Sequence, residues 1–146
     1  LKGIISTLIA TTLSPSSLTL PVLCAFSTVS GHVFPIYFSF KGGKGAATFI
    51  GTILVLFPLG ALICFITWIS VIFLSGYVGL ATILAAIIFP LSILIVGKMN
   101  LIFFGVTAML FVLIAHYKNF IRLLQGKENK FEKVHIFNPN SIWRKK

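Results

Sequence analysis

The chain has 146 residues, of which 58% are hydrophobic and only 10% are charged, against roughly 25% charged residues in a soluble domain. This composition excludes an ordinary soluble protein and indicates an integral membrane protein. The net charge is +10, but eight of the twelve Lys and Arg residues follow Tyr117, so the expected partner is an anionic membrane surface and not a nucleic acid. We expect residues 1–117 to form a transmembrane domain and residues 118–146 a basic C-terminal segment.

The apolar residues fall into segments that predict an all-α membrane fold. A spanning helix needs about 20 apolar residues, because its backbone must satisfy its own hydrogen bonds across a hydrocarbon layer about 30 Å thick. Apolar runs extend from Gly3 to Leu13, from Leu18 to Phe40 and from Asn100 to His116. Between them, the uncharged stretch from Gly45 to Gly97 is interrupted by Pro and Gly at "FPLG" and "SGYVG", which favours three segments. We therefore expect six membrane segments, some of them short or broken.

The positions of the basic residues support three middle segments over two. With three, the loop that carries Lys41 and Lys44 lies on the same side as Lys2 and the C-terminal tail, and only Lys98 lies on the other side. Two segments would place the loop and the tail on opposite faces. Because basic residues of short loops collect on the cytoplasmic side, this count predicts that the loop and the C-terminus are cytoplasmic.

The residue types in the chain limit the chemistry it can perform. There is no Asp, and the two Glu residues are Glu128 and Glu132, so a mechanism that needs two close carboxylates, as in most glycoside hydrolysis, is not expected. Cys24 and Cys64 stand far apart in apolar runs, without the spacing of a metal site. We expect both to be buried small hydrophobic residues, and we expect no metal and no cofactor.

The stretch "GHVFPIYFSFKGGKGAAT", residues 31–48, places two lysines among glycines between two apolar segments. Glycine lets backbone N–H groups approach a ligand closely, and a helix that starts near Gly45 would point its free N–H groups at the same place. The pattern is not a Walker A loop, because Gly45 follows Lys44 where Ser or Thr is required. Two interpretations remain: a phosphate site, or lysines that mark a helix end beside a glycine turn. The candidate phosphate ligands are Lys41, Gly42, Gly43, Lys44 and Gly45.

A second polar motif, "HYKNFIRLLQGKE", extends from His116 to Glu128 and is expected at the same face of the membrane. His116 and Asn119 are three residues apart and share a face if the segment is helical, with Arg122 one turn further. An imidazole can exchange a proton near neutral pH, and Arg can bind a phosphate with two hydrogen bonds. The alternatives are an interfacial His116 and a Glu128 that only pairs with a neighbouring basic residue.

Together, the two motifs resemble the PlsY family of bacterial membrane glycerol-3-phosphate acyltransferases. The similarity lies in a GHxFPxxxxFKGGKGxAT pattern at residues 31–48 and an HxxNxxRLxxGxE pattern at residues 116–128, and it extends over most of the chain. The resemblance implies transfer of a fatty acyl group from acyl phosphate to the 1-hydroxyl of glycerol 3-phosphate. The implied products are lysophosphatidic acid and phosphate, formed at the cytoplasmic face of the bacterial inner membrane.

The resemblance also implies roles for individual residues. His116, Asn119 and Glu128 are the candidate catalytic residues, and the glycine-lysine loop with Arg122 and His32 is the candidate substrate-binding set. The family carries an earlier motif, a Ser- and Gly-rich loop with an essential Arg after a first spanning helix, and a seven-helix fold. That motif is not in this sequence, and Leu1 is not a start methionine, so we expect the chain to be truncated at its N-terminus.

Two other classes of function are compatible with the composition. A transporter or channel for a small phosphorylated anion would use the glycine loop as a re-entrant feature near the membrane midplane. A non-catalytic membrane subunit would need only the basic tail. The charges in this sequence stand at the predicted ends of the segments, which favours an enzyme at the membrane surface over a transporter.

Overall fold

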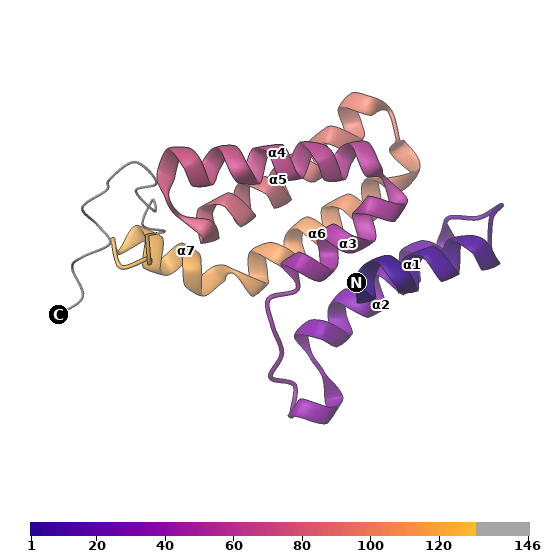
Figure 1. Ribbon diagram of the computed structural model, residues 1–146, viewed down its shortest axis with the longest axis horizontal. Coiled ribbons are helices and arrows are strands. Elements are labelled where there is room, and N and C mark those ends of the chain that lie inside the picture. Colours follow the sequence, from indigo (N-terminus) through magenta and orange to yellow (C-terminus); the bar gives the residue numbers. More distant parts are fainter. Residues whose placement is uncertain (131–146) are drawn as a thin grey trace, which may run out of the picture.

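The computed structural model describes residues 1–130, and the rest of the predicted C-terminal segment, with Glu132, lies outside the described residues. Within this range the protein is all-helical, as predicted, with seven α-helices, two short 3₁₀ helices and no strand (Figure 1). In chain order the elements are α1 (Lys2–Leu13), α2 (Thr19–Val33), η1 (Ile36–Phe38), α3 (Ala46–Leu56), α4 (Pro58–Ser75), α5 (Val78–Val96), η2 (Met99–Leu101), α6 (Ile102–Ala115) and α7 (Tyr117–Leu124).

The predicted interruptions of the middle stretch are confirmed as two tight helix connections. α3 ends just before Phe57, and Pro58 is the first residue of α4, where its missing N–H costs no hydrogen bond. α4 ends at Ser75 and is followed by Gly76, whose φ of 76° is a left-handed conformation that favours glycine. Three helices therefore occupy the stretch between Gly45 and Gly97, as the charge distribution required.

Only some of these helices are long enough to cross a bilayer. The segment Thr19–Phe38, α4 and α5 have the length and hydropathy of spans, and α6 with α7 makes a fourth if the pair, bent by 57°, counts as one. The helices α1 and α3 have 12 and 11 residues. At 1.5 Å per residue they reach about 18 and 17 Å, well short of a hydrocarbon layer about 30 Å thick. The expectation of six membrane segments is thus supported as six apolar helices, α1 to α6, but not as six crossings.

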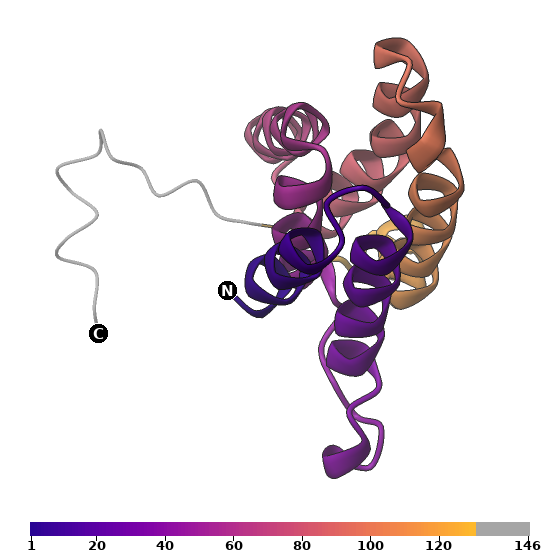
Figure 2. The same cartoon turned by 90° about the vertical axis from the view of Figure 1, so that its right-hand side faces the viewer.

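Successive helices from α3 to α6 run in opposite directions, which brings the charged motifs to one end of the molecule (Figure 1). We call this end, formed by the start of α3, the turn between α4 and α5, and α7, the polar end. Lys44 and Asn119, which are 75 positions apart in the sequence, are hydrogen-bonded there. The connection between α2 and α3, which carries η1, projects beyond the helices in both views (Figure 1 and Figure 2).

The buried interior of the helix bundle is held by aromatic rings. The rings of Phe49, Phe57, Phe89 and Phe104 are buried and in contact, and the Phe49–Phe89 centroids are 5.3 Å apart in an edge-to-face arrangement. Helix α1 approaches α3 so closely that a Cβ placed on Gly3 would lie 2.3 Å from the Thr48 carbonyl oxygen. Small residues at helix contacts are typical of membrane bundles, where close backbone approach replaces the hydrophobic effect between helices.

Candidate functional site

Lys44 and Gly45 lie at the N-terminus of α3, which is directed at the polar end. Gly45 adopts a φ of 78° and precedes the first helical residue, Ala46, as predicted. Among residues 1–130, no side chain is found to cap this terminus. The first amide groups of a helix have no partner within the helix and carry a partial positive charge, so the start of α3 with the Lys44 side chain forms a site that favours an anion.

The other residues of the glycine-lysine motif serve a different purpose in this structure. The amides of Gly42 and Gly43 donate hydrogen bonds to the carbonyls of Val33 and His32, at 3.2 and 3.3 Å, and so close the loop back onto the end of α2. A Cβ on Gly42 would meet the His32 carbonyl oxygen at 2.1 Å. Glycine is needed at position 42 for this close backbone approach, and the amides of both glycines are occupied here. That Gly42 and Gly43 bind phosphate stays a prediction, and these hydrogen bonds do not support it.

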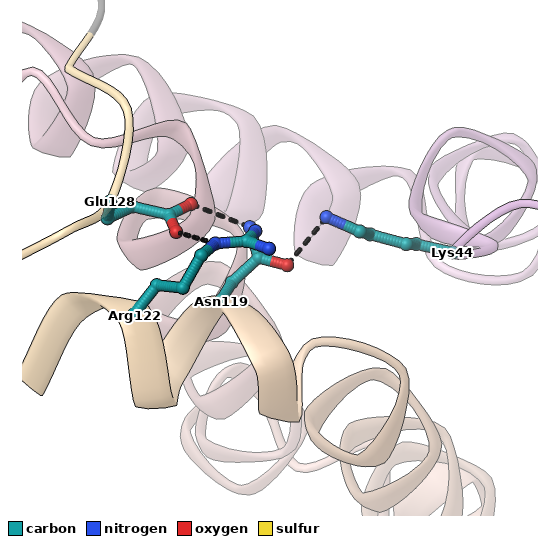
Figure 3. Close-up of polar contacts among 4 residues, drawn as sticks. All are labelled: Lys44, Asn119, Arg122 and Glu128. Carbon is teal, nitrogen blue, oxygen red and sulfur yellow. Dashed lines mark hydrogen bonds and ion pairs between the residues drawn. The ribbon is translucent and has the colours of Figure 1, made fainter. Parts of the chain in front are cut away.

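Asn119 lies at the centre of a polar network that joins α3, α7 and the segment after α7 (Figure 3). Lys44 Nζ donates to Asn119 Oδ1 at 2.5 Å, and Asn119 Nδ2 donates to Glu128 Oε1 at 2.7 Å. Arg122 Nε donates to the second oxygen, Oε2, at 2.8 Å. Because a carboxylate can only accept, Glu128 orients the Asn119 amide with its carbonyl toward Lys44. The predicted pairing of Glu128 with a neighbouring basic residue is confirmed.

These contacts favour the ionised form of Glu128. The hydrogen bond from Arg122, helped by the one from Asn119, holds the pKa of the Glu128 carboxyl below its usual value. Its side chain is only 7% exposed, whereas that of Arg122 is 46% exposed. The chain brings Glu128 back to Asn119 by a turn at Gly126, whose φ is 65°.

His116 stands at the bend between α6 and α7, just beyond the last residue of α6. It is 4% exposed, and its Nδ1 lies 3.0 Å from the carbonyl oxygen of Val112. A carbonyl oxygen can only accept, so Nδ1 carries the proton and the neutral ring keeps a lone pair on Nε2. Burial lowers the pKa of His116 below its ordinary value of 6.5, and the neighbouring Lys44 acts in the same direction. The His116 ring is therefore neutral at neutral pH.

A cavity of about 830 Å³ opens at this network and continues between the helices. Its polar part holds most of the predicted site residues, namely His32, Lys44, Gly45, His116, Asn119, Arg122 and Glu128. Its apolar part is lined by residues of α3, α4, α5 and α6, among them Phe49, Ile50, Cys64, Phe65, Trp68, Ala85, Ala86 and Val112. Three predicted binding residues, Lys41, Gly42 and Gly43, do not line it. One space thus joins a cationic, hydrogen-bonding end to an apolar limb.

The sequence motifs did not reveal the contribution of α5. Val78 and Gly79, at its N-terminus, line the cavity, so a second uncapped helix start faces the polar network. A Cβ on Gly79 would lie 2.9 Å from Glu128 Oε1 and 3.0 Å from the Asn119 side chain, which shows how closely α5 approaches α7. The "SGYVG" turn is the available signal in the sequence, and by itself it predicts only an interruption between two segments. Cys64 is buried as expected, yet it lines the apolar limb, and Cys24 is only partly buried.

Comparisons with known proteins agree with this arrangement. The sequence profile of the family described as Glycerol-3-phosphate acyltransferase matches residues 1–126. A glycerol-3-phosphate acyltransferase of Aquifex aeolicus is 34% identical over 132 residues, which cover 90% of this chain and 69% of that protein. One of Allorhizobium ampelinum is 38% identical over 112 residues, which cover 77% and 54%.

Solved structures show the same helical arrangement. The crystal structure of PlsY (YgiH), an integral membrane glycerol 3-phosphate acyltransferase, in its glycerol 3-phosphate form has a TM-score of 0.82 at 34% identity. That match covers 88% of this chain and 65% of PlsY, and a lysophosphatidic acid form gives a TM-score of 0.81 at 33% identity. Across the curated relatives named above, the chain spans between about half and seven-tenths of their length. The protein is an integral membrane protein and belongs to the glycerol-3-phosphate acyltransferase family.

Proposed function

We propose that the cavity is the active site of an acyltransferase that moves a fatty acyl group from acyl phosphate to the 1-hydroxyl of glycerol 3-phosphate. One observation carries the proposal: a single cavity joins a cationic end to an apolar limb. Its volume of about 830 Å³ is near the upper end of the roughly 300–1,000 Å³ of ligand pockets. The polar end suits a phosphate, and the apolar limb suits a hydrocarbon chain.

Phosphate charge is met at the polar end by several positive groups. Lys44 and Arg122 supply full charges, and the starts of α3 and α5, which no side chain of the described residues caps, supply their first amide groups. Lys44 is bound to Asn119 in this structure, so a phosphate would replace the Asn119 oxygen or share the ammonium group with it. Arg122 keeps the N–H groups that Glu128 does not use.

His116 is the proposed general base. The oxygen of the glycerol hydroxyl attacks the carbonyl carbon of acyl phosphate and forms the new ester bond. The bond between that carbon and the phosphate oxygen breaks, and the electron pair leaves with the phosphate. The hydroxyl proton passes to Nε2 of His116, which is unprotonated because Nδ1 donates to Val112. No covalent intermediate on the protein is required, because the acyl group is already activated.

Asn119 and Glu128 have the contacts of positioning groups. Glu128 uses both carboxylate oxygens to hold Asn119 and Arg122, so its predicted catalytic part is best explained as orientation of these two residues. Asn119, only 7% exposed, presents its amide oxygen to the space beside Lys44. Preorganised groups of this kind lower the barrier without rearrangement during the reaction.

The proposed orientation places the polar end at the cytoplasmic face of the bacterial inner membrane. Lys44, Arg122 and Lys130 line the cavity there, and we expect the other basic residues after Tyr117 on the same side, where they would contact anionic headgroups. The turn with Lys98 lies at the opposite end. A donor with a long chain would then enter from the bilayer, and the soluble acceptor would enter from the cytoplasm.

The deciding assay uses membranes that contain the chain, labelled glycerol 3-phosphate and acyl phosphate. We expect labelled lysophosphatidic acid with acyl phosphate and none with acyl-CoA. Because relatives are longer, a second preparation carries the additional family segment fused ahead of residue 1. Absence of product from both preparations, with the protein shown to be folded, would reject the proposal. Uptake of glycerol 3-phosphate into vesicles without any donor would favour a transporter.

A further inference from the structure

One aromatic side chain lies between the apolar limb of the cavity and a second, smaller cavity. Phe49 of α3 lines the limb, and it also lines a second cavity of about 10 Å³ between α2, α3 and α6. Val112 of α6 is the other residue that the two cavities share. The smaller cavity is lined by apolar side chains and is about the size of one water molecule. A hydrocarbon chain in the limb cannot reach this cavity, because the Phe49 ring lies between them.

The Phe49 ring cannot easily move aside. It is 7% exposed, and it packs edge-to-face against Phe89 at 5.3 Å and lies 6.2 Å from Phe104. Both partner rings are themselves buried, at 0% and 3% exposure. A close-packed ring held by two others forms a fixed wall, because neighbouring side chains leave little free volume for another rotamer.

On its other side the limb reaches the lipid-facing surface of α4. Phe65 lines the cavity and is also 51% exposed, on a helix of which only a small part is buried. From Gly79, at the polar network, to Ala86, the last residue of α5 that lines the cavity, there are seven residue steps, or about 10 Å at 1.5 Å per residue. A lipid acyl chain spans half of the hydrocarbon layer, about 15 Å. A full chain therefore does not fit in the limb and has to leave it past Phe65.

We propose that Phe49, backed by Phe89, is a specificity-determining residue that turns the acyl chain outward and restricts its shape where it bends. This inference rests on the proposed acyltransferase function. Methylene groups before the bend lie against Phe49, so a methyl branch there meets a wall. Methylene groups beyond the bend lie in the bilayer and are not sensed by the protein. The protein should thus select acyl chains by their shape near the carboxyl end and hardly by their total length.

The test uses acyl phosphates of equal carbon number that differ only in the position of one methyl branch. Equal carbon number keeps the partition of the donors into the bilayer nearly constant. For the wild-type protein in nanodiscs we expect kcat/KM to fall by on the order of tenfold when the branch lies at the depth of Phe49, as one misplaced methylene does in an apolar pocket. Branches near the chain end should have no effect. Phe49→Ala should remove the fall, because it joins the limb to the smaller cavity.

Two further variants make the result unambiguous. Phe49→Leu removes less volume than Phe49→Ala and should reduce the fall partly, which covers the case that the Ala variant does not fold. Phe26→Ala is the matched control, because Phe26 lines only the smaller cavity. A flat branch profile in the wild type, or a fall that persists in a folded Phe49 variant, overturns the inference alone. A wild type that makes no lysophosphatidic acid with the straight chain overturns the proposed function and the inference with it.

Discussion

The two polar motifs differ in how much of each one reaches the cavity. In the second motif, every residue that we singled out lines it: His116, Asn119, Arg122 and Glu128. In the first motif, His32, Lys44 and Gly45 line it, whereas Lys41, Gly42 and Gly43 do not. The second motif is anchored by α6 and α7, so helical periodicity directs its side chains to one side. The first is a loop, and the amides of Gly42 and Gly43 bond it back to the end of α2.

His116→Gln is the substitution with the largest expected effect on the second motif. Glutamine keeps a polar side chain of similar reach but cannot accept a proton, so we expect kcat to fall by about 10²- to 10⁴-fold while the KM for glycerol 3-phosphate changes little. Steady-state kinetics in nanodiscs measure both constants. Turnover within a factor of three of the wild type would show that His116 is not the base.

The two lysines of the first motif provide the sharpest contrast. Lys44→Ala should raise the KM for glycerol 3-phosphate by about 10- to 100-fold, because a hydrogen bond to a charged group contributes about 1.5–3 kcal/mol. Lys41→Ala should change it by less than about threefold, because exposed charges outside the cavity are screened. The pair is matched in residue type and in the loop that carries it. Equal effects would mean that the loop changes conformation when substrate binds.

The dependence of activity on pH tests the state of His116. Its pKa is lowered, chiefly by burial, so the ring is neutral at pH 7 and kcat should be constant there. As the pH falls through the lowered pKa, below 6.5, the ring becomes protonated and kcat should fall tenfold per pH unit. Lys44→Ala removes a charge that opposes protonation and should move this fall to higher pH. If kcat of the wild type already begins to fall above pH 6.5, burial does not lower the pKa of His116.

Much of this site could be predicted from the sequence, for physical reasons that differ between residues. The charge count and the Pro and Gly interruptions gave the correct number of helices between Gly45 and Gly97, which brings Lys44 to Asn119. The spacing of His116 and Asn119 suggested one helix face, but the chain bends at His116, so the two lie together across a bend. The start of α5 and the Phe49 wall could not be predicted, because they depend on how helices pack and not on a local pattern.

Glu128→Gln tests whether the network in the second motif acts by positioning. The amide can still accept one hydrogen bond, but its other end donates, so Asn119 or Arg122 loses its partner. We expect kcat/KM to fall by about tenfold, as for one lost hydrogen bond to a charged group. Glu128 also raises the pKa of His116, so the loss of its charge should move the fall of kcat at acid pH to lower pH. A purely structural role would lower the amount of folded protein and leave the pH profile in place.

The smallest expected effect compares two adjacent glycines in the half of the first motif that does not reach the cavity. A Cβ on Gly42 would lie 2.1 Å from the backbone oxygen of His32, which cannot move without shifting the end of α2. A Cβ on Gly43 would lie 2.6 Å from the His32 ring nitrogen, and a side chain can rotate away. Gly42→Ala should therefore lower the free energy of unfolding by about 1–3 kcal/mol, the usual cost of overpacking, and Gly43→Ala by less. Thermal unfolding in detergent measures this loss of stability, and KM measured in parallel reports any effect on substrate binding.

One outcome would contradict the assignment of Gly43 to loop closure alone. If both variants are stable and Gly43→Ala alone raises the KM for glycerol 3-phosphate, the amide of Gly43 binds phosphate after leaving the His32 carbonyl. The contrast between the two motifs would then disappear in the substrate complex.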